Sequence, residues 1–101
     1  MDGRTNLHER LVRVLGSRHV YFQPPPDVRL VYPCIVYKFN GVNVQHADDR
    51  SYRSNDRYII TIIDRNPDSN IRKRVEELPY IRFERAYSAD NLYHWVYEIS
   101  I

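Results

Sequence analysis

The sequence predicts an α+β fold, a single small domain in which a mostly antiparallel sheet of about four to five strands carries two helices on one face. Two segments place apolar residues at helical spacing, and several others are alternating or β-branched and end at turn signals. The predicted strands follow one another through short turns, which favours antiparallel pairing. The predicted order is helix, hairpin, strand, helix, hairpin. The 101 residues suffice for one domain with its own core.

The first predicted element is a helix in residues 1–16. Between Arg4 and Leu15 apolar residues recur three and four positions apart, and Gly16 follows where a helix C-cap is expected. The apolar residues are Leu7, Leu11, Val12, Val14 and Leu15. We therefore expect an amphipathic helix that lays this stripe on the sheet.

Residues 17–29 are expected to cross the surface as a stiff, proline-rich strap. The three consecutive prolines from Pro24 to Pro26 fix an extended path and offer no backbone N–H groups to a sheet. A polyproline ligand for a recognition module is less favoured, because no further proline stands at the spacing that such ligands need.

Residues 30–101 are expected to form the sheet. Leu30 to Asn40 alternate as a strand, and Asn40-Gly41 predicts a hairpin turn, after which Val42 to His46 return as the partner strand. Residues 47–56 are polar and charged and contain neither glycine nor proline. This segment is interpreted either as a long polar loop or as hairpin ends that extend beyond the core.

The next two predicted elements are a central strand and the second helix. Arg57 to Asp64 are apolar on both faces, so this strand should lie in the interior of the sheet. The helix is expected over residues 69–78, with Ser69 as its cap and Pro79 at its end. Its inner stripe consists of Ile71, Val75 and Leu78.

The chain is expected to end in a second hairpin, formed by Tyr80 to Tyr87 and Leu92 to Ile101. The connecting residues 88–91 read Ser-Ala-Asp-Asn. Such residues suit a tight turn, because their short polar side chains bond to the local backbone.

Composition excludes several classes of protein. The chain is 43% hydrophobic and 28% charged, and its apolar runs are far shorter than the about 20 residues of a membrane-spanning helix. Its first residues mix acids with arginines and contain no apolar stretch, so we expect no secretory signal, no membrane partner and synthesis in the cytoplasm. Cys34 lies alone in an apolar run, which favours a buried structural thiol.

The aspartates around the apolar central strand raise the question of an active site. A divalent cation would need several of them, namely Asp48, Asp49, Asp56, Asp64 and Asp68. Arg65 directly follows Asp64, however, and the spacing matches no calcium loop or general-acid set. We favour a structural strand-to-helix joint, formed by Asp64, Pro67, Asp68 and Ser69. We therefore expect no enzyme, no metal site and no cofactor.

Other binding chemistries are weakly supported. The four histidines lie in different predicted elements, and with three glycines the chain offers no phosphate-binding loop. Basic residues interleaved with aromatic ones would suit nucleic acid, and they are Arg72, Lys73, Arg74, Arg82 and Arg85. Nearby glutamates and a net charge of only +2 weaken this alternative. Nearly all of the 15 cations are arginine and nine residues are tyrosine, two residue types enriched in protein interfaces.

Several collinear stretches resemble the small tail completion, or tail terminator, proteins of long-tailed bacteriophages. The resemblance covers most of the chain from Val20 onward and contains no catalytic signature. The stretches that carry it are Val20-Tyr21-Phe22-Gln23-Pro24-Pro25, Tyr32-Pro33-Cys34-Ile35-Val36-Tyr37, Tyr58-Ile59-Ile60-Thr61-Ile62-Ile63-Asp64-Arg65-Asn66-Pro67-Asp68-Ser69, Leu78-Pro79-Tyr80 and Ala89-Asp90-Asn91-Leu92-Tyr93-His94. The third proline, Pro26, and Asn66 in place of an aspartate depart from the pattern, and neither has a known chemical role.

This resemblance implies a structural virion protein located at the head-tail neck and assembled in the host cytoplasm. Subunits similar to it form a closed ring of about six on the finished tail tube, end its polymerisation and join the tail to the head. The implied partners are further copies of the chain, the tail tube protein and the head-tail connector or stopper protein. DNA would pass through the lumen without specific recognition. Another neck role, such as head closure or connector adaptor, fits the sequence equally, and a nucleic-acid-binding module is the remaining alternative.

The hypothesis for the contact surface rests on residues 47–56. This segment is too long and too polar for a simple hairpin turn. We expect the contacts with neighbouring subunits and the tube to be anchored by Arg50, Tyr52, Arg53 and Arg57.

Overall fold

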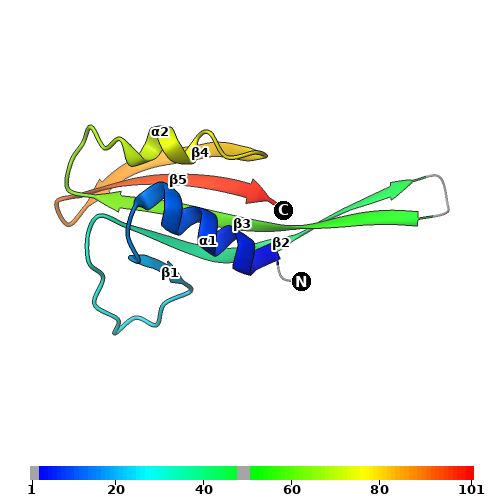
Figure 1. The fold of residues 1–101 in the computed structure, drawn as a ribbon, viewed down its shortest axis with the longest axis horizontal. Coiled ribbons are helices and arrows are strands. Elements are labelled where there is room, and N and C mark those ends of the chain that lie inside the picture. The colour runs from blue at the N-terminus through cyan, green and yellow to red at the C-terminus, as the bar shows by residue number, and fades with distance from the viewer. Residues whose placement is uncertain (1–2, 48–50) are drawn as a thin grey trace.

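In chain order the elements are α1 (Gly3–Leu15), β1 (Val20–Phe22), β2 (Cys34–Ala47), β3 (Ser51–Asp64), α2 (Ile71–Val75), β4 (Ile81–Ala89) and β5 (Leu92–Ser100). The structure is a computed structural model that describes residues 3–47 and 51–101, with the backbone alone for residues 44–47 and 51–54. The strands form one sheet in the order β1-β2-β3-β5-β4 (Figure 1). Only the β1–β2 pair is parallel among these strands. The predicted α+β class is confirmed.

The core lies between the sheet and the two helices. Leu7 and Leu11 of α1 and Val75 of α2 are fully buried against a row of side chains from the central strands. This row consists of Ile35 and Tyr37 on β2, Tyr58, Ile60 and Ile62 on β3, and Tyr97 and Ile99 on β5. Register places these strand residues on one face, because Tyr37 pairs with Ile60 and Ile60 with Tyr97. Both helices therefore cover the same face of the sheet, as predicted.

The N-terminal helix follows its sequence pattern. α1 ends at Leu15, and Gly16 adopts a positive φ of 82° while its N–H donates to the carbonyl of Val12 at 2.9 Å. This is the left-handed C-cap conformation that favours glycine. No helix within the described residues is both long and apolar enough to cross a bilayer.

The strap of residues 17–29 contains a strand that the sequence did not predict. β1 pairs with β2 in parallel, with Val20 opposite Ile35, before the chain turns away at Gln23. The Gln23 side-chain oxygen accepts a hydrogen bond from the backbone N–H of Phe39 at 3.0 Å. Three residues are too few to show an alternating pattern, and their partner lies about 15 positions further along the chain.

The predicted hairpin turn at Asn40-Gly41 is wrong. β2 continues through both residues, and the pairing with β3 shifts by a bulge between Phe39 and Val42. A two-residue turn of the Asn-Gly type needs positive φ at both positions, whereas only Gly41 has one, at 99°. A β-bulge needs positive φ at only one residue, so Asn40-Gly41 forms a bulge here and not a hairpin turn.

For residues 47 and 51–56 the predicted polar loop is also wrong, and the alternative of extended hairpin ends is confirmed, whereas residues 48–50 lie outside the described residues. β2 runs to Ala47 and β3 begins at Ser51, with Val42 opposite Asp56 and Ala47 opposite Ser51. We call residues 42–47 and 51–56 the hairpin arm. It projects beyond the helices and β5 (Figure 1), and gives the molecule extents of 51 × 24 × 23 Å.

The second helix is shorter than the predicted range 69–78. α2 covers Ile71–Val75, and beyond it the N–H groups of Glu77 and Leu78 bond three residues back instead of four. Such bonds tighten the last turn of a helix before Pro79, which cannot continue it. The final hairpin is confirmed, but β4 extends to Ala89, so the turn consists of Asp90 and Asn91 alone and not of residues 88–91; these two have φ of 55° and 64°.

Candidate functional site: the hairpin arm and its base

The hairpin arm is the part of β2 and β3 that extends beyond the region where β3 pairs with β5. Asp56 and Ile101 exchange two backbone hydrogen bonds, of 3.0 and 2.9 Å, which extend the ladder between β3 and β5 by one pair. Further out, the described backbone of β3 pairs with β2 alone, in register as far as Ala47 and Ser51. The arm is thus a two-stranded ribbon on the end of a five-stranded sheet.

The base of the arm is shaped by the bulge at Gly41. A Cβ on this residue would lie 3.0 Å from the terminal nitrogen Nη2 of Arg57, closer than nearly all real contacts. The absence of a side chain therefore leaves room for the Arg57 guanidinium beside the backbone of β2. Glycine is required here both for its positive φ and for this close approach.

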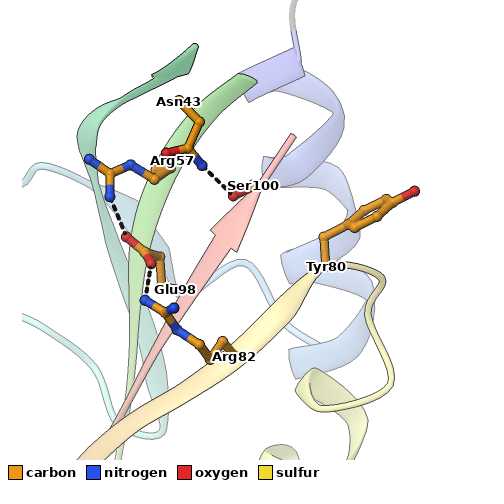
Figure 2. Close-up of a pocket in the computed structure, with 6 residues that line it drawn as sticks. All are labelled: Asn43, Arg57, Tyr80, Arg82, Glu98 and Ser100. Carbon is orange, nitrogen blue, oxygen red and sulfur yellow. Dashed lines mark hydrogen bonds and ion pairs between the residues drawn. The ribbon is translucent and has the colours of Figure 1, made fainter. Parts of the chain in front are cut away.

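A buried carboxylate binds four strands together at this base. Glu98 of β5 is 8% exposed and accepts hydrogen bonds from Asn40 on β2, Arg57 on β3 and Arg82 on β4, at 3.2, 3.5 and 2.5 Å (Figure 2). Arg82 also contacts Glu84 at 2.8 Å. Two guanidinium groups and an amide thus offset the cost of removing one negative charge from water.

The same residues line a shallow open cleft of about 340 Å³. Its walls are formed by Asn43, Arg57, Tyr80, Arg82, Glu98 and Ser100. Figure 2 shows the Tyr80 ring turned away from the charged cluster, and this side chain is 83% exposed. The cleft contains donors and one saturated carboxylate but no nucleophile paired with a base. Its chemistry suits the recognition of polar groups on another chain more than a reaction.

Of the four residues proposed from the sequence as contact anchors, two lie on the arm and one at its base. Arg57 lies at its base and forms the ion pair with Glu98. Tyr52 and Arg53 lie on the outer part of β3, where the structure describes the backbone alone. Arg50 lies outside the described residues. Register brings Tyr52 and Arg53 opposite His46 and Gln45, at the far end of the arm from Arg57.

The residues proposed as a strand-to-helix joint lie at the opposite end of β3. Asp64 accepts a bond from the N–H of Asn66 at 3.1 Å, and Asn66 in turn accepts one from the N–H of Asp68 at 2.9 Å. The buried Ser69 hydroxyl accepts a bond from the N–H of Ile71 at 3.3 Å. The predicted cap at Ser69 is wrong, because the N-cap of α2 is Asn70, whose side chain makes no cap bond. Pro67 lies between them on the surface. These contacts are those of a turn.

Metal and thiol chemistry find little support in the described part of the chain. No group of three or more His, Cys, Asp or Glu side chains there is placed to hold a metal ion. Cys34 is fully buried, as predicted, and burial with the nearby charge of Asp64 raises its pKa to about 12. Burial also raises the pKa of Tyr97, which donates to Glu76 at 2.5 Å.

Three residues of the arm base were misassigned or missed from the sequence, whereas Arg57 and Arg82 were named there in other roles. Asn40 and Gly41 were assigned to a turn, and Glu98 was not singled out. One signal was available, because Glu98 is the only acidic residue in the otherwise apolar and aromatic strand Leu92–Ser100. A lone carboxylate in such a strand indicates a paired buried charge.

Comparisons of the chain with protein-family models and with curated proteins found no match.

Proposed function

We propose that this chain is a structural virion protein of a tailed phage, which forms a ring that caps the tail tube and joins the tail to the head connector. The proposal rests on the sequence stretches that resemble the tail terminator proteins and on the geometry of the hairpin arm. In this role the protein resides at the head-tail neck after assembly in the host cytoplasm. It is not an enzyme and needs no cofactor.

The observation that carries the proposal is the arm itself. A two-stranded ribbon without a third strand or a helix against it is marginally stable in water. The arm nevertheless starts from a rigid base, where Gly41 and the Glu98 cluster set its direction. A projecting element that is held at its root and uncovered along its length is suited to contact another subunit.

The mechanism of capping follows from complementarity. One face of the ring matches the end of the tube, and the other lacks the surface that recruits the next tube subunit. Contacts between neighbours are of the head-to-tail type, which close into a ring of about six when the rotation per subunit divides the circle. DNA passes through the lumen, and the connector or stopper protein meets the free face.

A shortened arm tests this function. Residues 44–54 are replaced by Asn-Gly. Because Asp56 directs its backbone groups to Ile101, the next pair, Asn43 and Asn55, is the hydrogen-bonded pair that a two-residue turn can close. The wild-type protein and this variant are added to polymerising tail tube protein from the same phage. Tube length is measured by electron microscopy and the mass of the added protein by light scattering.

We expect the wild-type protein to stop tube growth at low molar ratio and to form rings at tube ends. The shortened variant should unfold in urea like the wild-type body but leave tubes long. Wild-type protein that never changes tube length overturns the proposal. If that protein instead binds DNA as a monomer at low salt, nucleic-acid binding becomes the better function.

A further inference from the structure

The two helices and the residues that adjoin them carry an excess of positive charge. We call residues 3–18 and 71–78 the helix layer. This layer contains seven arginines and lysines and three glutamates, a net charge of +4, whereas the whole sequence carries only +2. Six of these cations are exposed, namely Arg4, Arg10, Arg13, Arg18, Lys73 and Arg74. The low overall charge therefore conceals a basic surface on the side of the sheet that the helices cover (Figure 1).

Several of these cations gather where the two helices meet. Arg10 and Arg13 are three positions apart on α1, so they lie on the same side of that helix. The Nε of Arg74 on α2 donates a hydrogen bond of 2.6 Å to the carbonyl of Val14, which holds its guanidinium at the last turn of α1, next to Arg13. Within the described residues, Arg10, Arg13 and Lys73 form no ion pair. Their charges are therefore available to a partner.

The exposed surface of the helices is polar, and this restricts the kind of partner. All eight exposed large hydrophobic residues of the described chain lie outside α1 and α2. A protein interface has an apolar or aromatic core, and a helix that binds a membrane has an exposed apolar face. Contacts with phosphate need only positive charge and hydrogen-bond donors. Thr5 and Asn6 on α1 are exposed and add such donors.

We propose that the helix layer binds the phosphate backbone of duplex DNA without reading its sequence, through Arg10, Arg13, Lys73 and Arg74. The 13 residues of α1 span about 20 Å, a length over which duplex DNA carries about 12 phosphate charges. This inference goes beyond the proposed function and does not depend on it, because the binding surface belongs to a single subunit.

The opposite face of the sheet provides matched control positions. Lys38 follows Tyr37, which faces the helices, so Lys38 lies on the other face of β2. Arg85 pairs with Val96, which precedes the helix-facing Tyr97 on β5, so Arg85 lies on that other face too. Both side chains are exposed. They carry the same charge as the cations of the helix layer, on the other side of the molecule.

Lysine footprinting of the wild-type protein shows which face meets DNA. The chain contains two lysines, Lys73 in the helix layer and Lys38 on the opposite face. Each is acetylated sparingly with and without a saturating short duplex of mixed sequence at low salt, and mass spectrometry measures both rates. DNA should slow acetylation of Lys73 several-fold and leave Lys38 unchanged. Protection of neither lysine, of Lys38 alone, or of both equally overturns the proposal.

Paired substitutions separate the position of the charges from their number. Arg10→Gln with Arg13→Gln removes two charges from the helix layer, and Lys38→Gln with Arg85→Gln removes two from the other face. Fluorescence anisotropy of a labelled duplex measures affinity over a range of salt concentrations. The logarithm of the wild-type association constant should fall with the logarithm of salt concentration with a slope of about −3 to −4, because each phosphate contact contributes about −0.9.

The helix-layer pair should bring this slope about 2 units closer to zero and weaken binding about tenfold or more at low salt. The control pair should change the affinity less than about threefold, because screening by salt confines a surface charge to its own neighbourhood. Equal losses in both pairs overturn the proposal. Urea unfolding checks that the variants fold, and Lys73→Gln, which should change the slope by about 1, replaces the helix-layer pair if it does not.

Competition distinguishes DNA from an acidic protein partner. Unlabelled duplex of another sequence should displace the labelled DNA fully, and polyglutamate at the same concentration of charge should displace it far less, because its charges are less dense. Equal displacement by both overturns the assignment to DNA. Capping is judged separately by tube length. Absence of DNA binding leaves capping intact, and DNA binding by protein that never alters tube length supports this inference and overturns capping.

Discussion

Glu98 lies where four strands meet, and its carboxylate contacts side chains from the three others. Asn40, Arg57 and Arg82 reach it from strands that are separated by up to 58 positions along the chain. Its two charged partners remain in contact with water, since their side chains are 33% and 70% exposed. The carboxylate of Glu98 is therefore buried, whereas the guanidinium groups of Arg57 and Arg82 remain in contact with water. The negative charge of Glu98 holds these two guanidinium groups in place.

Replacing Glu98 with glutamine should destabilise the protein by about 1–2 kcal/mol. Hydrogen bonds to a charged group contribute about 1.5–3 kcal/mol, and solvent contact of the two arginines reduces the loss. Urea unfolding of Glu98→Gln measures the change. Glu84→Gln is the matched control, because Glu84 also contacts Arg82 but is more exposed, and its effect should stay within about 0.5 kcal/mol. Equal stability of the two variants would contradict the role given to Glu98.

The bulge at Gly41 makes β2 one long strand in place of a hairpin, and so creates the arm. Two residues contribute to this bulge, because the missing side chain of Gly41 leaves the space that the Arg57 guanidinium fills. The positive φ of Gly41, 99°, is a separate requirement. Gly16 at the end of α1 also has a positive φ, of 82°, but no atom lies within 4 Å of a Cβ built on it. A comparison of the two glycines therefore separates backbone strain from crowding.

Gly41→Ala should cost about 2 kcal/mol, and Gly16→Ala about 1 kcal/mol, because only the first adds crowding to the strain of a positive φ. In an Arg57→Ala background the cost of Gly41→Ala should fall to about 1 kcal/mol. The four variants of this double-mutant cycle are compared by urea unfolding. A cost that does not depend on Arg57 would mean that the close approach carries no energy.

The strands and helices could be predicted where their cause is local. The stripe of α1 and the apolar run of β3 each carry their signal in adjacent residues, and each was placed correctly. The turn predicted at residues 88–91 was placed to within two residues, because Ser88 and Ala89 belong to β4. The dipeptide Asn40-Gly41 is compatible with a hairpin turn or with a β-bulge. Contacts with the distant residues Arg57 and Glu98 favour the bulge. β1 was missed for the same reason, because its partner β2 lies elsewhere in the sequence. A local pattern of apolar and polar residues does not show which distant strands will pair.

The shape of the whole molecule departs from that of a compact domain. A globular chain of this length has a radius of gyration of about 13 Å, whereas the Cα radius of gyration here is 14.7 Å. The body contains the core, and the arm adds length without adding buried apolar residues among those described. A molecule of this form is expected to gain stability when a partner covers the arm, because an isolated two-stranded ribbon is marginally stable in water.

Small-angle X-ray scattering of the free protein should detect the arm. In monomeric samples, the variant with residues 44–54 replaced by Asn-Gly should have a radius of gyration about 2 Å smaller than the full chain, near the value for a compact domain. The described part of the removed segment, residues 44–47 and 51–54, lies at the projecting end of the molecule, where residues contribute most to this quantity (Figure 1). Ser88→Ala is the full-length control and should match the wild-type protein. Light scattering must give the monomer mass in each sample, which is 12.2 kDa for the full-length chain and correspondingly less for the shortened variant. Equal radii for the long and short chains would mean that the arm lies against the body, and would contradict the projecting arm on which the proposed function rests.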